Sequence, residues 1–185
     1  GAIFTNSDED AELIRSIRLH GKGSQKYDNV RVGMNSRLDT IQAAVLIAKL
    51  EVFPSELKQR HKISQWYNTL LSDWVEVPSL PVGLTSAWAQ YTIQVDNRDS
   101  VQSELRSKNI PSIVYYPIPL HRQAGYKHYP SVSSGLSVSE RLSQRVLSLP
   151  MHPYMTEEAV NGIGLSLIQI VKNKTISTNS GHNSI

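Results

Sequence analysis

The most regular hydrophobic pattern in the chain begins just after Gly33 and continues to residue 53. Five apolar residues recur there at helical spacing and predict a long helix with one buried face: Leu38, Ile41, Val45, Ala48 and Val52. Gly33 tolerates backbone angles that a side chain would forbid, which favours a tight turn before the helix. Ser36 followed by Asp39 is typical of a capping box, which satisfies the first free N–H groups. Pro54 is expected to break or kink this helix, or to begin a new one.

Capping residues and periodicity predict further helices on both sides of this one. Ser7, with Asp10 three residues later, begins a predicted helix that Gly21 closes. Helical periodicity also continues over residues 57–71. Thr156 is expected to cap the last helix. The apolar stripe of that helix consists of Val160, Ile163, Leu167 and Ile170.

Strands are predicted where apolar and polar residues alternate. Residues 91–95 show this alternation and predict a half-buried strand. A second strand is predicted over 112–116, where Pro117 ends it. Residues 1–5 are expected to form a short strand, and residues 149–154 a short extended piece.

Two short helices are predicted in the same half of the chain. Asn97 or Asp99 can cap the first, and Asn109 is expected to end it because asparagine tolerates the left-handed cap conformation. The second covers 137–146 and begins with a Ser-x-x-Glu capping pattern that ends at Glu140.

These elements predict three regions. Residues 1–53 contain too little strand to close a sheet and end in the long helix. Residues 54–172 interleave strands with helices, which predicts an α/β or α+β domain. Residues 173–185 are rich in Ser, Asn and Thr, which predicts a disordered polar tail.

Composition excludes several function classes. The chain has 185 residues, of which 39% are hydrophobic and 19% charged, as is usual for a globular protein. It has no cysteine, which excludes disulfides and cysteine-bound metals and fits a cytoplasmic location. No apolar run is long enough for a membrane helix. The net charge of +3 is spread along the chain, so no nucleic-acid partner is predicted. The histidines lack zinc-site spacing, and no Gly-x-Ser-x-Gly elbow supports a hydrolase.

Asn35 and Arg37 lie where the long helix is expected to begin. Free N–H groups and the helix dipole favour an anion at such a position, so a phosphate or carboxylate could bind there. The alternative is that both residues only complete the helix cap.

Three ordered segments of the chain resemble the DegT/DnrJ/StrS family of pyridoxal-phosphate-dependent nucleotide-sugar aminotransferases. These segments are Gly33–Asp39 followed by Gln42-Ala43-Ala44, then Ser86–Thr92, then Tyr116–His121. The combination most resembles members that aminate a UDP-linked 3-keto uronic acid sugar for bacterial surface polysaccharide. The resemblance implies the C-terminal small domain of the aspartate-aminotransferase-like (fold type I) architecture, preceded by a fragment of the large domain.

The resemblance also implies roles for individual residues. Family members are dimers with shared active sites, so Asn35 would reach the neighbour's cofactor phosphate. The apolar face of residues 1–53, left without a partner, also favours a dimer or larger oligomer. Arg37 would bind an anionic group of cofactor or substrate. Tyr115 and Tyr116 replace a His-Tyr pair of the sugar pocket, and His121 matches a family histidine of undefined role. The alternative for these last three is an aromatic strand end that packs the core.

The same resemblance implies that one essential group is missing. The family's lysine that forms the Schiff base with pyridoxal 5'-phosphate would lie upstream of Gly1. We therefore expect this chain alone to bind no cofactor, to have no catalytic residue and to be inactive. The alternative is a truncated stand-alone module that self-associates or binds a nucleotide sugar without catalysis.

Overall fold

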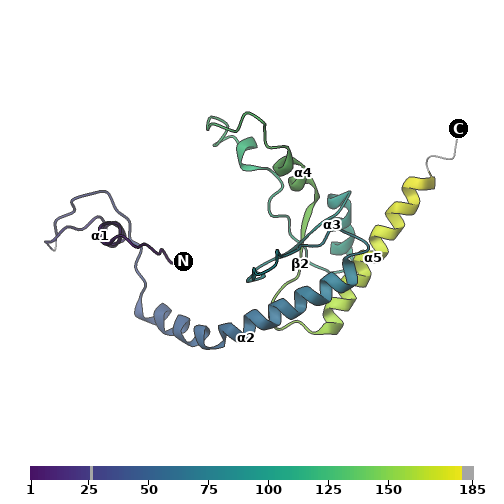
Figure 1. Cartoon of the computed structure of the whole chain (residues 1–185), viewed down its shortest axis with the longest axis horizontal. Coiled ribbons are helices and arrows are strands. Elements are labelled where there is room, and N and C mark those ends of the chain that lie inside the picture. The colour runs from purple at the N-terminus through teal and green to yellow at the C-terminus, as the bar shows by residue number, and fades with distance from the viewer. Residues whose placement is uncertain (26, 181–185) are drawn as a thin grey trace. The chain divides into compact units, whose positions relative to one another are not determined.

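The structure, a computed structural model, describes residues 1–25 and 27–180. Five α-helices, two strands and one 3-10 helix follow one another along these residues (Figure 1). In chain order they are α1 (Asp8–Ile17), α2 (Thr40–Leu71), β1 (Tyr91–Gln94), α3 (Arg98–Ser107), η1 (Leu120–Arg122), α4 (Ser137–Arg145), β2 (Val146–Leu149) and α5 (Glu157–Ser180). The chain divides into two compact units, Gly1–Val52 and Phe53–Ile185, which we describe separately.

Helix α1 of the first unit forms as its capping residues predict. Ser7 Oγ accepts a hydrogen bond of 3.1 Å from the Asp10 amide, which satisfies one of the free N–H groups of the first turn. Residues 1–5, expected to be a strand, take no strand pairing among the described residues. A strand requires a hydrogen-bonded neighbour, and an apolar run alone does not supply one.

The turn before α2 differs from its prediction in two ways. Helix α2 begins at Thr40, and Asp39 caps it by accepting a 2.9 Å hydrogen bond from the Gln42 amide, so Ser36 is not the cap. Gly33 does not have a positive φ. It is required because a Cβ there would lie 2.0 Å from the Gly21 nitrogen. Glycine is therefore needed here because two backbone segments approach closely, and not because the backbone takes unusual angles.

Helix α2 runs through Pro54 without ending there. Its last turns belong to the second unit, where they contribute Ile63, Tyr67 and Leu71 to the core. The helix neither breaks nor begins anew at the proline, so these two of the predicted outcomes are wrong, although the division between the two units falls close to it.

The sheet of the second unit is a single antiparallel pair. Strand β1 pairs with β2 from Tyr91 opposite Leu149 to Gln94 opposite Val146. Strand β1 matches its prediction, with alternating buried and half-buried residues. Strand β2 was expected to be the end of a helix and the start of an extended piece. The predicted strand over 112–116 is reduced to one bridge between Ile113 and Ser148.

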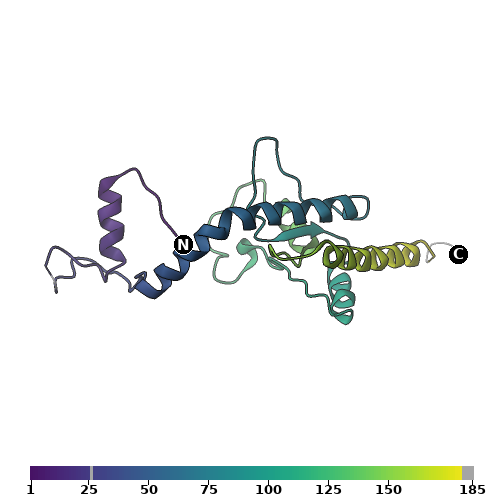
Figure 2. The ribbon, with the colours of Figure 1, turned by 90° about the horizontal axis from the view of Figure 1, so that it is seen from below.

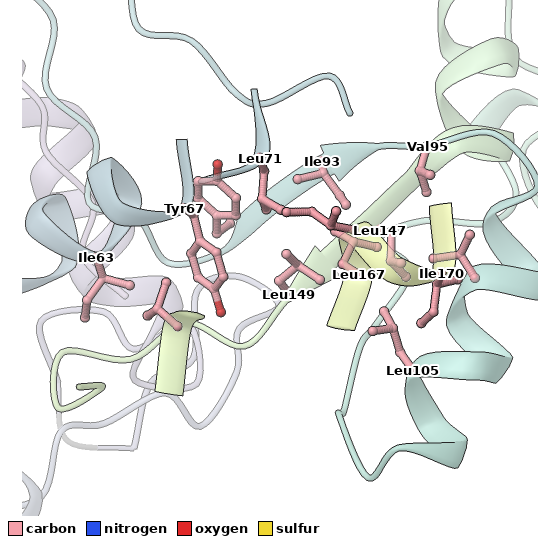
Figure 3. Packing of buried hydrophobic residues seen from close by; sticks show 14 of the residues in the cluster. Ile63, Tyr67, Leu71, Ile93, Val95, Leu105, Leu147, Leu149, Leu167 and Ile170 are labelled. Carbon is pink, nitrogen blue, oxygen red and sulfur yellow. The ribbon is translucent and has the colours of Figure 1, made fainter. Parts of the chain in front are cut away.

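The hydrophobic core lies where α2, α3 and α5 meet this sheet. Figure 3 shows the side chains of these elements gathered in one cluster. Tyr67 and Tyr91 stack at its centre with ring centroids 4.7 Å apart. The Tyr67 hydroxyl donates a hydrogen bond of 3.0 Å to the Pro150 carbonyl, and burial raises the pKa of this phenol well above its usual range. The ring is therefore neutral and donates at every physiological pH.

Helix α5 packs closely against α2 at a glycine. A Cβ on Gly164 would lie 2.3 Å from Cδ2 of Leu70, so only glycine fits without displacing that side chain. Figure 2 shows α5 passing beside the last turns of α2. Thr156 caps α5 as predicted, since its Oγ1 accepts a 3.3 Å hydrogen bond from the Ala159 amide.

The last helix extends further than the composition of the chain suggests. Helix α5 continues to Ser180, so residues 173–180, expected to be disordered, are helical. The rest of the predicted tail, 181–185, lies outside the described residues.

Candidate functional site

The second unit contains a cavity of about 1060 Å³, here called the aromatic groove. Four tyrosines and one histidine lie in its lining: Tyr115, Tyr116, Tyr126, Tyr129 and His121. The chain leaves the sheet after the bridge at Ile113, and Pro117 and Pro119, which cannot donate to a strand ladder, precede η1 at Leu120. Helix α4 and the start of β2 supply the opposite wall through Leu142 and Val146.

Tyr115 and Tyr116 are adjacent residues in the lining of this groove. Their rings meet edge to face with centroids 5.7 Å apart. Their residues are 37% and 70% exposed, so neither is part of the hydrophobic core. The alternative that these residues pack the core is therefore wrong for both. Two exposed phenols on a concave surface can donate hydrogen bonds and stack on a ligand.

His121 is held by a carboxylate on α4. Its Nε2 lies 3.0 Å from Oε1 of Glu140 on α4. The same oxygen accepts a 2.8 Å hydrogen bond from Nε of Arg122. These two bonds connect η1 to α4 across the sequence between them.

The two donors also change the acidity of Glu140. Hydrogen bonds first from His121 and then from Arg122 lower the pKa of the Glu140 carboxyl below its ordinary value. The carboxyl is therefore ionised at neutral pH and acts only as an acceptor.

Asn35 and Arg37 belong to the first unit. The backbone of Asn35 forms an antiparallel bridge with Leu19, and the neighbouring Ser36 amide donates to the Arg18 carbonyl at 3.0 Å. These bonds fix the turn against the end of α1. Both Asn35 and Arg37 are exposed, and Asp39 caps the helix instead. Helix capping therefore does not account for either side chain, and both are exposed to solvent.

Sequence reasoning missed part of the site. Glu140 was assigned to helix capping, yet α4 begins at Ser137 without a side-chain cap and the carboxylate binds His121. Tyr126 and Tyr129 lie in a polar stretch that gives no periodic signal. Among the described residues no group of acidic residues and histidines is arranged to hold a metal ion. No helix there is both long and apolar enough to cross a membrane.

Comparison with known families gives one match over most of the chain. The sequence profile of the "DegT/DnrJ/EryC1/StrS aminotransferase family" matches residues 1–167. A relative from Pseudomonas aeruginosa, UDP-2-acetamido-2-deoxy-3-oxo-D-glucuronate aminotransferase, is 43% identical over 171 residues, which are 90% of this chain and 46% of that protein.

Solved structures give the same result for the fold. A DegT DnrJ EryC1 StrS aminotransferase from Brucella abortus has a TM-score of 0.83 at 50% identity, covering 92% of this chain and 44% of that one. S. venezuelae DesV, solved in complex with a ketimine intermediate, has a TM-score of 0.82 at 28% identity, with 91% and 46% covered. The predicted fold class, part of a fold type I α/β aminotransferase, is confirmed. The chain spans about half the length of the relatives it matches.

Proposed function

Since the chain belongs to the DegT/DnrJ/EryC1/StrS aminotransferase family, we propose that it is the C-terminal part of an enzyme that transfers an amino group to a keto sugar carried by a nucleotide. In this proposal residues 1–53 are a remnant of the large domain and residues 54–172 are the small domain. The product would serve bacterial surface polysaccharide synthesis. The observation that carries the proposal is the aromatic groove, where Tyr115, Tyr116 and His121 line one cavity.

The groove suits a nucleotide sugar for chemical reasons. Aromatic rings stack on nucleobases and on the apolar faces of sugars. Phenol and imidazole groups can pair with sugar hydroxyls. Tyr115 stands where family members have a histidine, and a phenol is neutral where a histidine can be cationic. Tyr115 therefore supports recognition of hydroxyl groups more than of a uronate carboxylate.

The residues of the first unit fit the phosphate end of pyridoxal 5'-phosphate. The exposed Asn35 amide can donate to a phosphate oxygen, and the Arg37 guanidinium can bind an anion in bidentate fashion. When bound, this cofactor supplies the electron sink that amino-group transfer requires. We assign no lysine of the chain to hold the cofactor's aldehyde. We therefore propose that Asn35 and Arg37 act in the site of a second copy, and that this chain alone does not transaminate.

Binding of UDP-N-acetylglucosamine to the chain, measured by isothermal titration calorimetry, tests the proposal. We expect Tyr116→Ala to weaken binding about tenfold, because it removes a stacking surface and a hydrogen-bonding phenol. Tyr154→Ala is the matched control, since Tyr154 is 73% exposed and does not line the aromatic groove. Equal effects of the two substitutions, or no binding by the unsubstituted chain, would contradict the proposal.

We also propose that the chain forms a dimer through residues 1–53. The first turns of α2 expose many large apolar side chains, including Ile41, Ile47 and Leu50, which are 79%, 63% and 64% exposed. Apolar patches of this kind mark association surfaces. Analytical ultracentrifugation of the chain should therefore give a mass about twice that of one chain, which is 20.7 kDa. Ile41→Lys with Leu50→Lys should shift the mass to that of one chain, whereas Leu165→Lys on α5 should not.

A monomer at all concentrations would refute the dimer. It would leave the alternative of a module that binds a nucleotide sugar without self-association. A chain that dimerises and binds the sugar, yet shows no amino-group transfer with added cofactor and glutamate, is the outcome that we expect.

A further inference from the structure

The contact between Glu140 and His121 has a chemical consequence for the imidazole ring. Oε1 of Glu140 is 3.0 Å from Nε2 of His121, and the His121 side chain is only 24% exposed. An ionised carboxylate has no proton to donate, so Nε2 must carry the proton in this bond. The neutral imidazole then has its proton on Nε2, and Nδ1 is the ring nitrogen that can accept a hydrogen bond.

Arg122 makes the carboxylate a fixed partner. Its Nε and Nη2 lie 2.8 and 2.7 Å from the same Oε1. These charge-assisted bonds hold Glu140 ionised and aimed at η1. Arg122 itself is 63% exposed and does not line the groove, so its contact with the carboxylate is what connects it to the site.

A simple role in helix stability does not account for this arrangement. Acidic residues in the first turn of a helix can bind its free N–H groups. Helix α4, however, has no side-chain cap, and the Glu140 amide donates to the Leu136 carbonyl within the helix. The carboxylate instead points away from the helix end, towards the two side chains of η1.

We propose that Glu140 is a positioning residue that holds His121 with its proton on Nε2, so that Nδ1 accepts a hydrogen bond from a sugar hydroxyl in the aromatic groove. The ligand part rests on the proposed function, because it takes a nucleotide sugar as the occupant. The site would then favour a sugar that presents a hydroxyl donor to His121 over an analogue that lacks it, since an acceptor that the ligand covers without supplying a partner is costly.

Nitrogen-15 NMR of the histidine rings tests the first part without any ligand. At about pH 8, where imidazole is ordinarily neutral, the His121 proton should be observed on Nε2. In Glu140→Leu, which offers no acceptor, the signal of this ring proton should be lost by exchange with water. Glu140→Gln, which keeps an acceptor oxygen, should retain it in part. Glu104→Leu is the matched control, because Glu104 is also a half-exposed, ion-paired carboxylate but lies on α3. A proton on Nδ1, or no change in Glu140→Leu, would overturn the inference.

Binding of UDP-N-acetylglucosamine tests the second part through a double-mutant cycle. Glu140→Leu should weaken binding about tenfold in the original chain, and should have no further effect once His121→Ala is present. An equal loss in both backgrounds would show that Glu140 acts independently of His121, and would overturn its positioning role. A chain with the expected ring proton but no affinity for the nucleotide sugar would instead refute the proposed function, and with it the ligand part of this inference.

Discussion

Replacing Tyr67 by alanine is expected to lower the free energy of unfolding of the second unit by about 3–5 kcal/mol. Tyr67 is fully buried and stacks on Tyr91, and its hydroxyl bonds to the Pro150 carbonyl. Truncation would remove the ring at the centre of the core, leave a cavity and leave that carbonyl without its donor. Urea unfolding followed by circular dichroism measures the change.

Two further variants separate the ring from its hydroxyl. Tyr67→Phe keeps the stacking and should cost only about 1 kcal/mol, the usual net contribution of one hydrogen bond. Tyr129→Ala removes an equal side chain that is 63% exposed, and should change stability by less than about 0.5 kcal/mol. A Tyr67→Ala effect as small as that of Tyr129→Ala would mean that the core is not organised around this ring.

Gly33→Ala is expected to open the turn that carries Asn35 and Arg37, at a cost of about 3 kcal/mol. The new Cβ would lie 2.0 Å from the Gly21 nitrogen and 2.4 Å from the His20 carbonyl carbon, and these backbone atoms cannot move aside like a flexible side chain. Hydrogen exchange of two amides reports the opening. The Met34 amide bonds to the Ile17 carbonyl at 2.8 Å, and the His20 amide bonds to the Met34 carbonyl at 3.0 Å.

Gly125→Ala provides the control for the turn. Gly125 has open space around its missing Cβ and a φ outside the left-handed region, so alanine there should leave both amides as protected as before. Unchanged protection of the Met34 amide in Gly33→Ala would contradict the close approach described for this turn.

Helix ends with one clear capping residue could be predicted from sequence, whereas ambiguous patterns could not. Ser7 and Thr156 cap α1 and α5 as expected. Ser36 and Asp39 are both good capping residues, so sequence alone could not decide between them. Strand β2 was missed because a short apolar run has the same pattern in a strand as in a buried helix segment.

The candidate site shows the same limit at the level of single residues. Tyr115, Tyr116 and His121 were selected through a family resemblance, and in the structure all three line the aromatic groove. Glu140 is 19 residues from His121, and its local pattern suggested a helix cap. Only the fold brings the two together, because a long-range contact between two polar side chains leaves no periodic trace in the sequence.

The pairing of β1 with β2 has a consequence for how this protein can diversify. Residues 95–145 form a long excursion between the two paired strands, and the aromatic groove is built largely from that excursion. Between η1 and α4 this excursion is a loop, residues 123–136, and the entropy of closing a flexible loop rises only with the logarithm of its length, so a doubling costs only about 0.6 kcal/mol. Insertions and deletions around 123–136 can therefore reshape the pocket while the strands keep their register. The fold thus separates the part of the chain that is free to change specificity from the part that must be conserved to fold.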